Sequence, residues 1–172
     1  MDTPPPTMKS SAALFLQGAV VLTGLAALTF LLGEPHLEGR NAHATLFEIY
    51  FKDPFLAYVY VGSIPFFVAL YRAFGLFGHV QRNGAFTPAT VKVLRTIKRC
   101  GLALLGFAAG GVAIILVFGD KEDRPPGLFM GFLAVLVSNS IAVGAAMFER
   151  NLQNALRRAE DSRTKTVGMS VR

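Results

Sequence analysis

Four long stretches without a charged residue constrain this chain more than any other feature of its sequence. They cover residues 10–33, 54–71, 100–119 and 125–148, and the apolar character of the second continues past Arg72 to Phe77. A bilayer core about 30 Å thick is crossed by roughly 20 apolar residues in a helix. Each stretch is near or above that length, so each predicts a membrane-spanning helix.

Three other architectures fit these stretches less well. A soluble helical bundle needs polar stripes on its outer faces, and none of the four stretches has one. A transmembrane β-barrel needs alternation of apolar and polar residues, which is also absent. The first stretch is too long for a cleaved signal peptide and lacks a clear cleavage site. The expected fold class is therefore all-α: a polytopic membrane protein with four transmembrane helices in an antiparallel up-down bundle.

The chain divides into three parts along this pattern. Residues 1–10 are rich in proline and predict a disordered cytoplasmic tail. The membrane domain covers 11–148, with spans at about 11–32, 55–77, 100–119 and 127–148. Residues 149–172 predict a cytoplasmic helix that prolongs the fourth span by about two or three turns, followed by a frayed tail.

The charged residues between the spans are distributed unequally. One side of the predicted membrane domain collects thirteen Lys and Arg residues and the other four, and the 72–100 connection has six cations and no acid. Because Lys and Arg accumulate on the cytoplasmic side, both termini are expected in the cytoplasm of a multi-pass inner-membrane protein. Anionic lipid headgroups are a sufficient partner for these cations, so no direct binding of nucleic acid is expected.

The basic stretch before the third span predicts the start of a long helix. Thr87 provides an N-cap hydroxyl and Pro88 fits the first helical position. No Gly or Pro interrupts the chain from there to Cys100, so this helix is expected to continue into the third span. The candidate surface for a cytoplasmic partner or for lipid headgroups consists of Arg82, Lys92, Arg95, Lys98, Arg99, Arg157 and Arg158. The first reading is anchoring to headgroups, and the second is docking of a partner or an anionic ligand.

The same region carries a family resemblance. The segments AFTPATVKVLRTIKRCGLALL, GDKEDRPPG and FERNLQNALRRAED, separated by apolar spans, make residues 55–161 resemble the YoaS-like family of small four-helix bacterial inner-membrane proteins, a domain of unknown function. The resemblance implies a pairing with a small helix-turn-helix regulator, because such a regulator commonly accompanies family members. The chain departs from the family at its more basic end, AEDSRTKTVGMSVR, which does not support a shared tail contact.

Polar residues inside the spans are few and uncharged. The spans hold no Asp, Glu, Lys or His at mid-depth, where such residues would indicate an ion or proton path. Gln17, Ser63 and Asn139 are the main polar candidates, either as packing contacts between helices or as the lining of a transport cavity. His36 and His43 match no metal-ligand spacing, and His79 is expected to be an interfacial residue at the cytoplasmic end of the second span. Cys100 is expected to be a small packing residue. Neither a catalytic site nor a cofactor is expected.

Small residues four apart are expected to let the last two spans approach closely. Packing within one chain is the first interpretation of these positions, and homodimerisation is the second. The positions are Gly106 and Gly110 in the third span, and Gly127, Gly131, Ser140 and Gly144 in the fourth.

Taken together, these features predict a non-enzymatic integral membrane protein that tethers or signals to a cytoplasmic regulator. The alternative is a small transporter or a transporter accessory subunit, which requires Gln17, Ser63 and Asn139 to face one another across a cavity.

Overall fold

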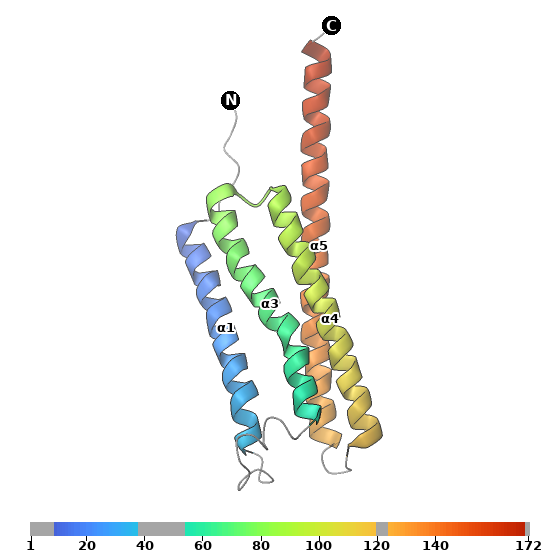
Figure 1. Ribbon diagram of the computed structural model, residues 1–172. Helices are drawn as coiled ribbons and strands as arrows, with labels where there is room; N and C mark the ends of the chain where they lie inside the picture. The colour runs from blue at the N-terminus through green and yellow to red at the C-terminus, as the bar shows by residue number, and fades with distance from the viewer. Residues whose placement is uncertain (1–8, 38–53, 120–123, 171–172) are drawn as a thin grey trace.

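The computed structural model describes residues 9–37, 54–119 and 124–170, and every regular element within these ranges is an α-helix. The helices are α1 (Ser10–Leu37), α3 (Pro54–Asn83), α4 (Pro88–Phe118) and α5 (Arg124–Ser170). Successive helices run in opposite directions (Figure 1). The predicted all-α class and the four antiparallel helices are confirmed.

The turn between α3 and α4 forms as its residues predict. Gly84 adopts a positive φ of 78°, and its N–H donates to the Val80 carbonyl at 3.0 Å. The Thr87 side chain accepts from the Thr90 N–H, and Pro88 follows the cap. α4 then continues without a break to Phe118, which confirms that the basic stretch and the third span form one helix.

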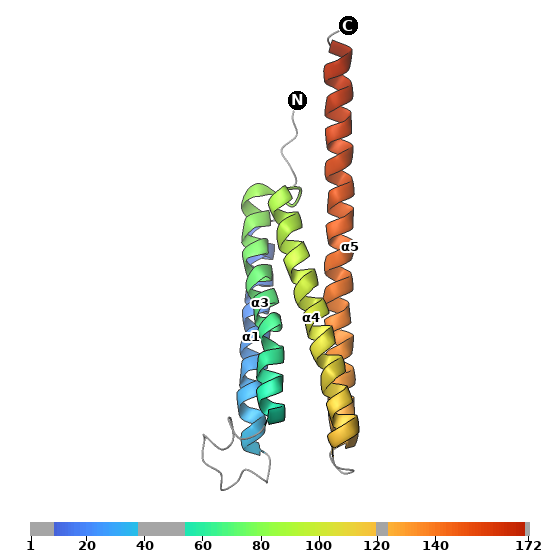
Figure 2. The ribbon, with the colours of Figure 1, turned by 45° about the vertical axis from the view of Figure 1, so that its right-hand side comes forward.

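The helices lie in a row rather than around a common axis. α1 packs on α3, α3 packs on α4, and α4 packs on α5, which is the most extensive of the three contacts. α1 and α5 thus form the two edges of the row (Figure 2). α5 is longer than expected, because it continues as a helix to Ser170 and projects beyond the other three helices.

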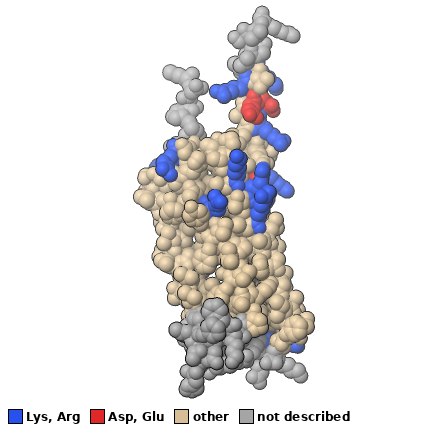
Figure 3. Space-filling model, viewed as in Figure 1, with Lys and Arg blue, Asp and Glu red and all other residues tan. Residues whose placement is uncertain are grey.

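All four helices are long and apolar enough to cross a membrane. In each helix, at most 17% of the most apolar segment is buried inside the structure. The surfaces of these segments therefore face outward. Figure 3 shows a wide band without charged side chains below a cluster of blue cations. In water this apolar surface would far exceed what a soluble monomer exposes, whereas a bilayer would cover it.

The best-buried apolar cluster lies at one end of this band. It joins Leu76 of α3, Val91 and Leu94 of α4, and Leu152 of α5. We call this end, which carries the 83–88 turn and the projecting part of α5, the basic end. This buried cluster therefore joins three of the four helices at the end where most of the described charged residues lie.

Candidate functional site

The basic end gathers nearly all the cations that the structure describes (Figure 3). Among the described residues of the opposite end, Arg124 donates from Nε to the Gly119 carbonyl at 2.8 Å. The described cations of the basic end are Lys9, Arg72, Arg82, Lys92, Arg95, Lys98, Arg99, Arg150, Arg157, Arg158, Arg163 and Lys165. Such a concentration attracts anionic groups.

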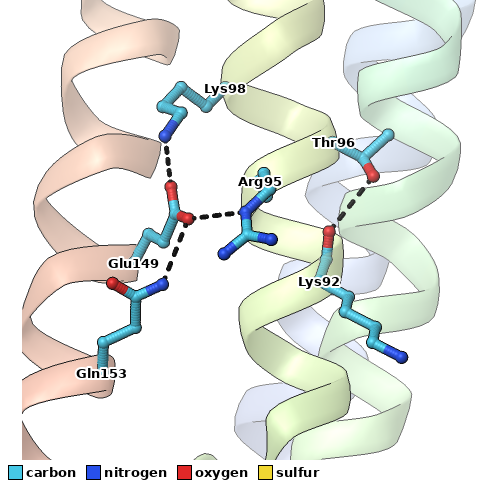
Figure 4. Close-up of polar contacts among 6 residues, drawn as sticks. All are labelled: Lys92, Arg95, Thr96, Lys98, Glu149 and Gln153. Carbon is cyan, nitrogen blue, oxygen red and sulfur yellow. Dashed lines mark hydrogen bonds and ion pairs between the residues drawn. The ribbon is translucent and has the colours of Figure 1, made fainter.

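One acid of α5, Glu149, forms ion pairs with two of these cations. Glu149 is only 5% exposed, and its carboxylate accepts from Arg95 Nε at 2.9 Å and from Lys98 Nζ at 2.5 Å. Gln153, one turn further along α5, also donates to this carboxylate at 3.4 Å. Figure 4 shows the two cations reaching from α4 to the same side chain of α5. We call Glu149, Arg95 and Lys98 the Glu149 clamp.

The two cations keep the acid of the clamp ionised. The hydrogen bond from Lys98, and then that from Arg95, hold the pKa of Glu149 below its ordinary value. Arg95 and Lys98 remain partly exposed, with 46% and 31% of their side-chain surface accessible. They can therefore be hydrated without Glu149, whereas buried Glu149 depends on them. The clamp fixes the register of α4 against α5 at the point where their apolar segments end.

Small residues below the clamp allow the two helices to approach closely. The buried positions of α5 follow a spacing of four and three residues: Ser138, Ala142, Ala145, Glu149 and Leu152. This heptad-like spacing places them on one stripe of the helix. Gly101 of α4 meets this stripe, since a Cβ on Gly101 would lie 2.8 Å from the Ala142 backbone nitrogen.

Beyond the clamp, the start of α4 and the projecting part of α5 enclose an open groove of about 300 Å³. Val91 and Leu156 supply its apolar lining, and Lys92, Arg157 and Glu160 supply charge. Its other lining residues are Pro88, Arg95 and Gln153. The groove combines a small apolar floor with Lys92 and Arg157, which form no ion pair with any described acid, so it suits an acidic, partly apolar ligand.

The predicted basic surface thus separates into groups with different surroundings. Arg95 and Lys98 are held by Glu149, while Lys92 and Arg157 line the groove. The remaining three, Arg82, Arg99 and Arg158, are exposed and lie outside the groove lining.

Sequence reasoning missed Glu149, although a signal was present. Glu149 is the first acid after the fourth neutral stretch, and it precedes Leu152 and Leu156 by three and seven residues. That spacing places it on the same face as the two leucines, and therefore on the face that packs on α4.

The predicted small-residue positions are divided among several surroundings. Gly127 and Gly131 of α5 face Ile115 and Val112 of α4, whereas Gly110 faces Tyr58 of α3. A Cβ on Gly106 or Gly144 would meet nothing within 4 Å, and Ser140 is exposed.

The polar residues of the spans do not meet. Gln17 of α1 donates to the Phe74 carbonyl of α3 at 3.2 Å, and Ser63 donates to the Tyr60 carbonyl of its own helix at 2.8 Å. Asn139 is exposed on α5. The cavity that the transporter alternative requires is therefore not formed by these three side chains.

The remaining candidates have ordinary surroundings or lie outside the described residues. His79 Nε2 contacts the Thr87 hydroxyl at 3.0 Å, within the turn between α3 and α4. Cys100 is half-buried at the start of the apolar part of α4. His36 lies where only the helical backbone is described, and His43 lies outside the described residues.

Comparison with known proteins identifies the family. The family model described as "Protein of unknown function (DUF2975)" matches residues 39–164. The chain is 32% identical over 152 residues to the Bacillus subtilis protein described as "Uncharacterized membrane protein YoaS", covering 87% of this chain and 94% of that protein. No solved structure matches. The resemblance to the YoaS-like family is confirmed: the chain belongs to the DUF2975 family, as a multi-pass membrane protein with four spans.

Proposed function

We propose that this protein is a non-enzymatic membrane tether or signalling partner, whose basic end docks an acidic surface of a soluble regulator. The observation that supports the proposal is the groove between α4 and α5, where Lys92 and Arg157 flank an apolar floor. Complementary charge speeds and directs docking, and the apolar floor provides area that can be buried.

The distribution of Lys and Arg supports a cytoplasmic position for this groove. Thirteen Lys and Arg residues fall on the side of the termini and the 72–100 connection, against four on the other, and such an excess is typical of cytoplasmic connections. The same pattern supports the proposal of an inner-membrane location. A membrane-impermeant thiol reagent should label Arg163→Cys only after cell lysis, in a Cys100→Ser background.

The distance of the groove from the end of the fourth apolar stretch favours a protein over lipid headgroups as its ligand. Arg157 follows Phe148, the last residue of the fourth apolar stretch, by nine positions, which is about 14 Å along a helix. The headgroup layer on each side of the bilayer is only about 5–8 Å thick. Arg99 and Arg150 are therefore at headgroup level, whereas Arg157 reaches into the aqueous phase.

The choice of a regulator to test rests on the family resemblance rather than on the groove. The resemblance to the YoaS-like family implies a pairing with a small helix-turn-helix regulator, so such a regulator is the first partner to test. Binding to the basic end would hold it at the membrane.

The test is site-specific photocrosslinking in native membranes. A photoreactive residue at position 92 or 157 should crosslink to a soluble acidic protein, and Lys92→Glu/Arg157→Glu should abolish its retention on the membrane. The matched control, Arg99→Glu/Arg150→Glu, makes the same charge change at headgroup level and should retain the protein. Equal retention by both variants, or crosslinks to lipid alone, would contradict the proposal.

A further inference from the structure

The edge helix α5 carries a second stripe of residues that packs on no described helix. Phe132, Leu136 and Val143 are 58%, 46% and 47% exposed, and Asn139 between them is exposed as well. Their spacing of four, three and four residues is that of a heptad seam. It repeats the spacing of the stripe that faces α4, on a different side of the same helix.

Asn139 distinguishes this stripe from ordinary lipid-facing surface. It lies near the middle of the neutral stretch 125–148, and its side chain makes no hydrogen bond in the part of the chain that the structure describes. Neighbouring Ser138 and Ser140, in contrast, donate to carbonyls of their own helix. An amide left unpaired in hydrocarbon is costly, so this side chain requires a partner from outside the described contacts.

We propose that this partner is a second copy of the same chain, joined through α5 as a parallel pair. Two copies insert in the same orientation, so a two-fold axis along the membrane normal brings each residue of the stripe next to its own equivalent. An amide contains both a donor and an acceptor. The Asn139 amide can therefore exchange hydrogen bonds with the Asn139 amide of a second copy. A single polar residue within an apolar seam also fixes the register of the two helices.

The sequence limits the contact to the membrane segment. Ala146 continues the spacing and is half-buried, and the next position of the repeat is Arg150. Two Arg150 side chains near the axis would repel each other, so the helices separate there. The groove at the basic end stays open in such a dimer, which makes the inference independent of the proposed function.

Cysteine crosslinking of the full chain in bilayers tests this arrangement. In a Cys100→Ser background, Val143→Cys should give a disulfide-linked dimer under mild oxidation. Ala134→Cys and Phe148→Cys, which are exposed and lie on the opposite face of α5, should give little. Crosslinking of all three to the same extent, or of the two control positions alone, would overturn the proposal.

Energy transfer between labelled chains tests the role of the amide. Asn139→Leu should weaken dimerisation about tenfold, because it removes both hydrogen bonds of the symmetric amide pair. Asn139→Gln, which keeps the amide, should dimerise nearly as the wild type does, and Ser140→Ala should have no effect. Helix content measured by circular dichroism separates lost association from lost folding. Unchanged dimerisation of a folded Asn139→Leu variant would overturn the assignment.

Discussion

The two edges of the row are held in different ways. α5 meets α4 through a stripe of buried small residues, a close backbone approach at Gly101 and the Glu149 clamp. Among the described side chains of α1, Ala13 alone is apolar and buried, and none of the most apolar segment of this helix is buried. The family match begins at residue 39, after α1, and extends through α3, α4 and α5 to residue 164.

The difference shows what joins helices in lipid. Apolar surface gains no hydrophobic free energy when it moves from lipid to another helix. Close packing and polar contacts therefore decide how strongly helices associate. The contact of α1 with α3 has only scattered polar links, such as Gln17 to the Phe74 carbonyl and Tyr60 to the Leu31 carbonyl. We therefore regard α4 and α5 as a fixed pair that supports the groove, with α1 as a more loosely held helix.

The largest expected effect on the free energy of unfolding comes from leaving Glu149 buried without its cationic partners. Arg95→Met/Lys98→Met leaves Glu149 without its cations and should lower the free energy of unfolding by about 3 kcal/mol. Adding Glu149→Leu should restore much of this loss, because the uncompensated charge disappears. Reversible unfolding in mixed detergent micelles measures both values. A double variant as stable as the wild type would show that the clamp contributes nothing.

Crowding the backbone contact should have the next largest effect. Gly101→Val places side-chain atoms against the Ala142 backbone, which cannot move without separating α4 from α5, and should cost about 2 kcal/mol. Gly106→Val makes the same change on the same helix, where a Cβ meets nothing within 4 Å, and should be nearly neutral. The same unfolding assay compares them, and equal losses would refute the close contact.

Acidification should weaken the same pair by a smaller amount, because a protonated carboxyl can still form hydrogen bonds. Glu149 has a pKa below its ordinary value, so its stabilising contribution is fully present above the pKa of an unfolded glutamate, about 4.3. It is lost as the pH falls through the lower pKa of the folded state. Unfolding between pH 7 and pH 3 should show this loss in the wild type and less of it in Glu149→Gln. Parallel pH profiles would contradict the assignment.

Removing one hydrogen bond between α1 and α3 should have the smallest effect on the free energy of unfolding. Gln17→Leu loses one side-chain hydrogen bond to α3 and should cost about 0.6 kcal/mol. Ser63→Ala removes a bond within a single helix and serves as the control. A loss as large as that of the clamp variant would mean that α1 is held as firmly as α5.

Much of the fold could be predicted because the membrane imposes long neutral segments that are visible in the sequence. The cap at Thr87 and the continuity of α4 followed from local residue chemistry. The extension of α5 to Ser170 did not, because residues 149–170 are mostly polar and their apolar spacing ends at Leu156. The row arrangement was also hidden, since small residues four apart occur on several sides of these helices.

The candidate site could be predicted only in part. The cations were evident from their number, but their different roles depend on which side of α4 meets α5. Arg95 and Lys98 differ from Lys92 through contact with Glu149, a lone acid in a basic segment. Its importance comes from burial, which charge counting does not reveal.

Distance measurement between spin labels in lipid nanodiscs tests the central claim most directly, namely that α5 is fixed to the bundle and α1 is held more loosely. In a Cys100→Ser background, labels at Arg82→Cys and Arg163→Cys should give one narrow distance distribution, and labels at Ser11→Cys and Arg82→Cys a broader one. Glu149→Ala should broaden the first distribution and leave the second unchanged. A broad first distribution in the otherwise wild-type chain, or one that Glu149→Ala does not alter, would contradict the account.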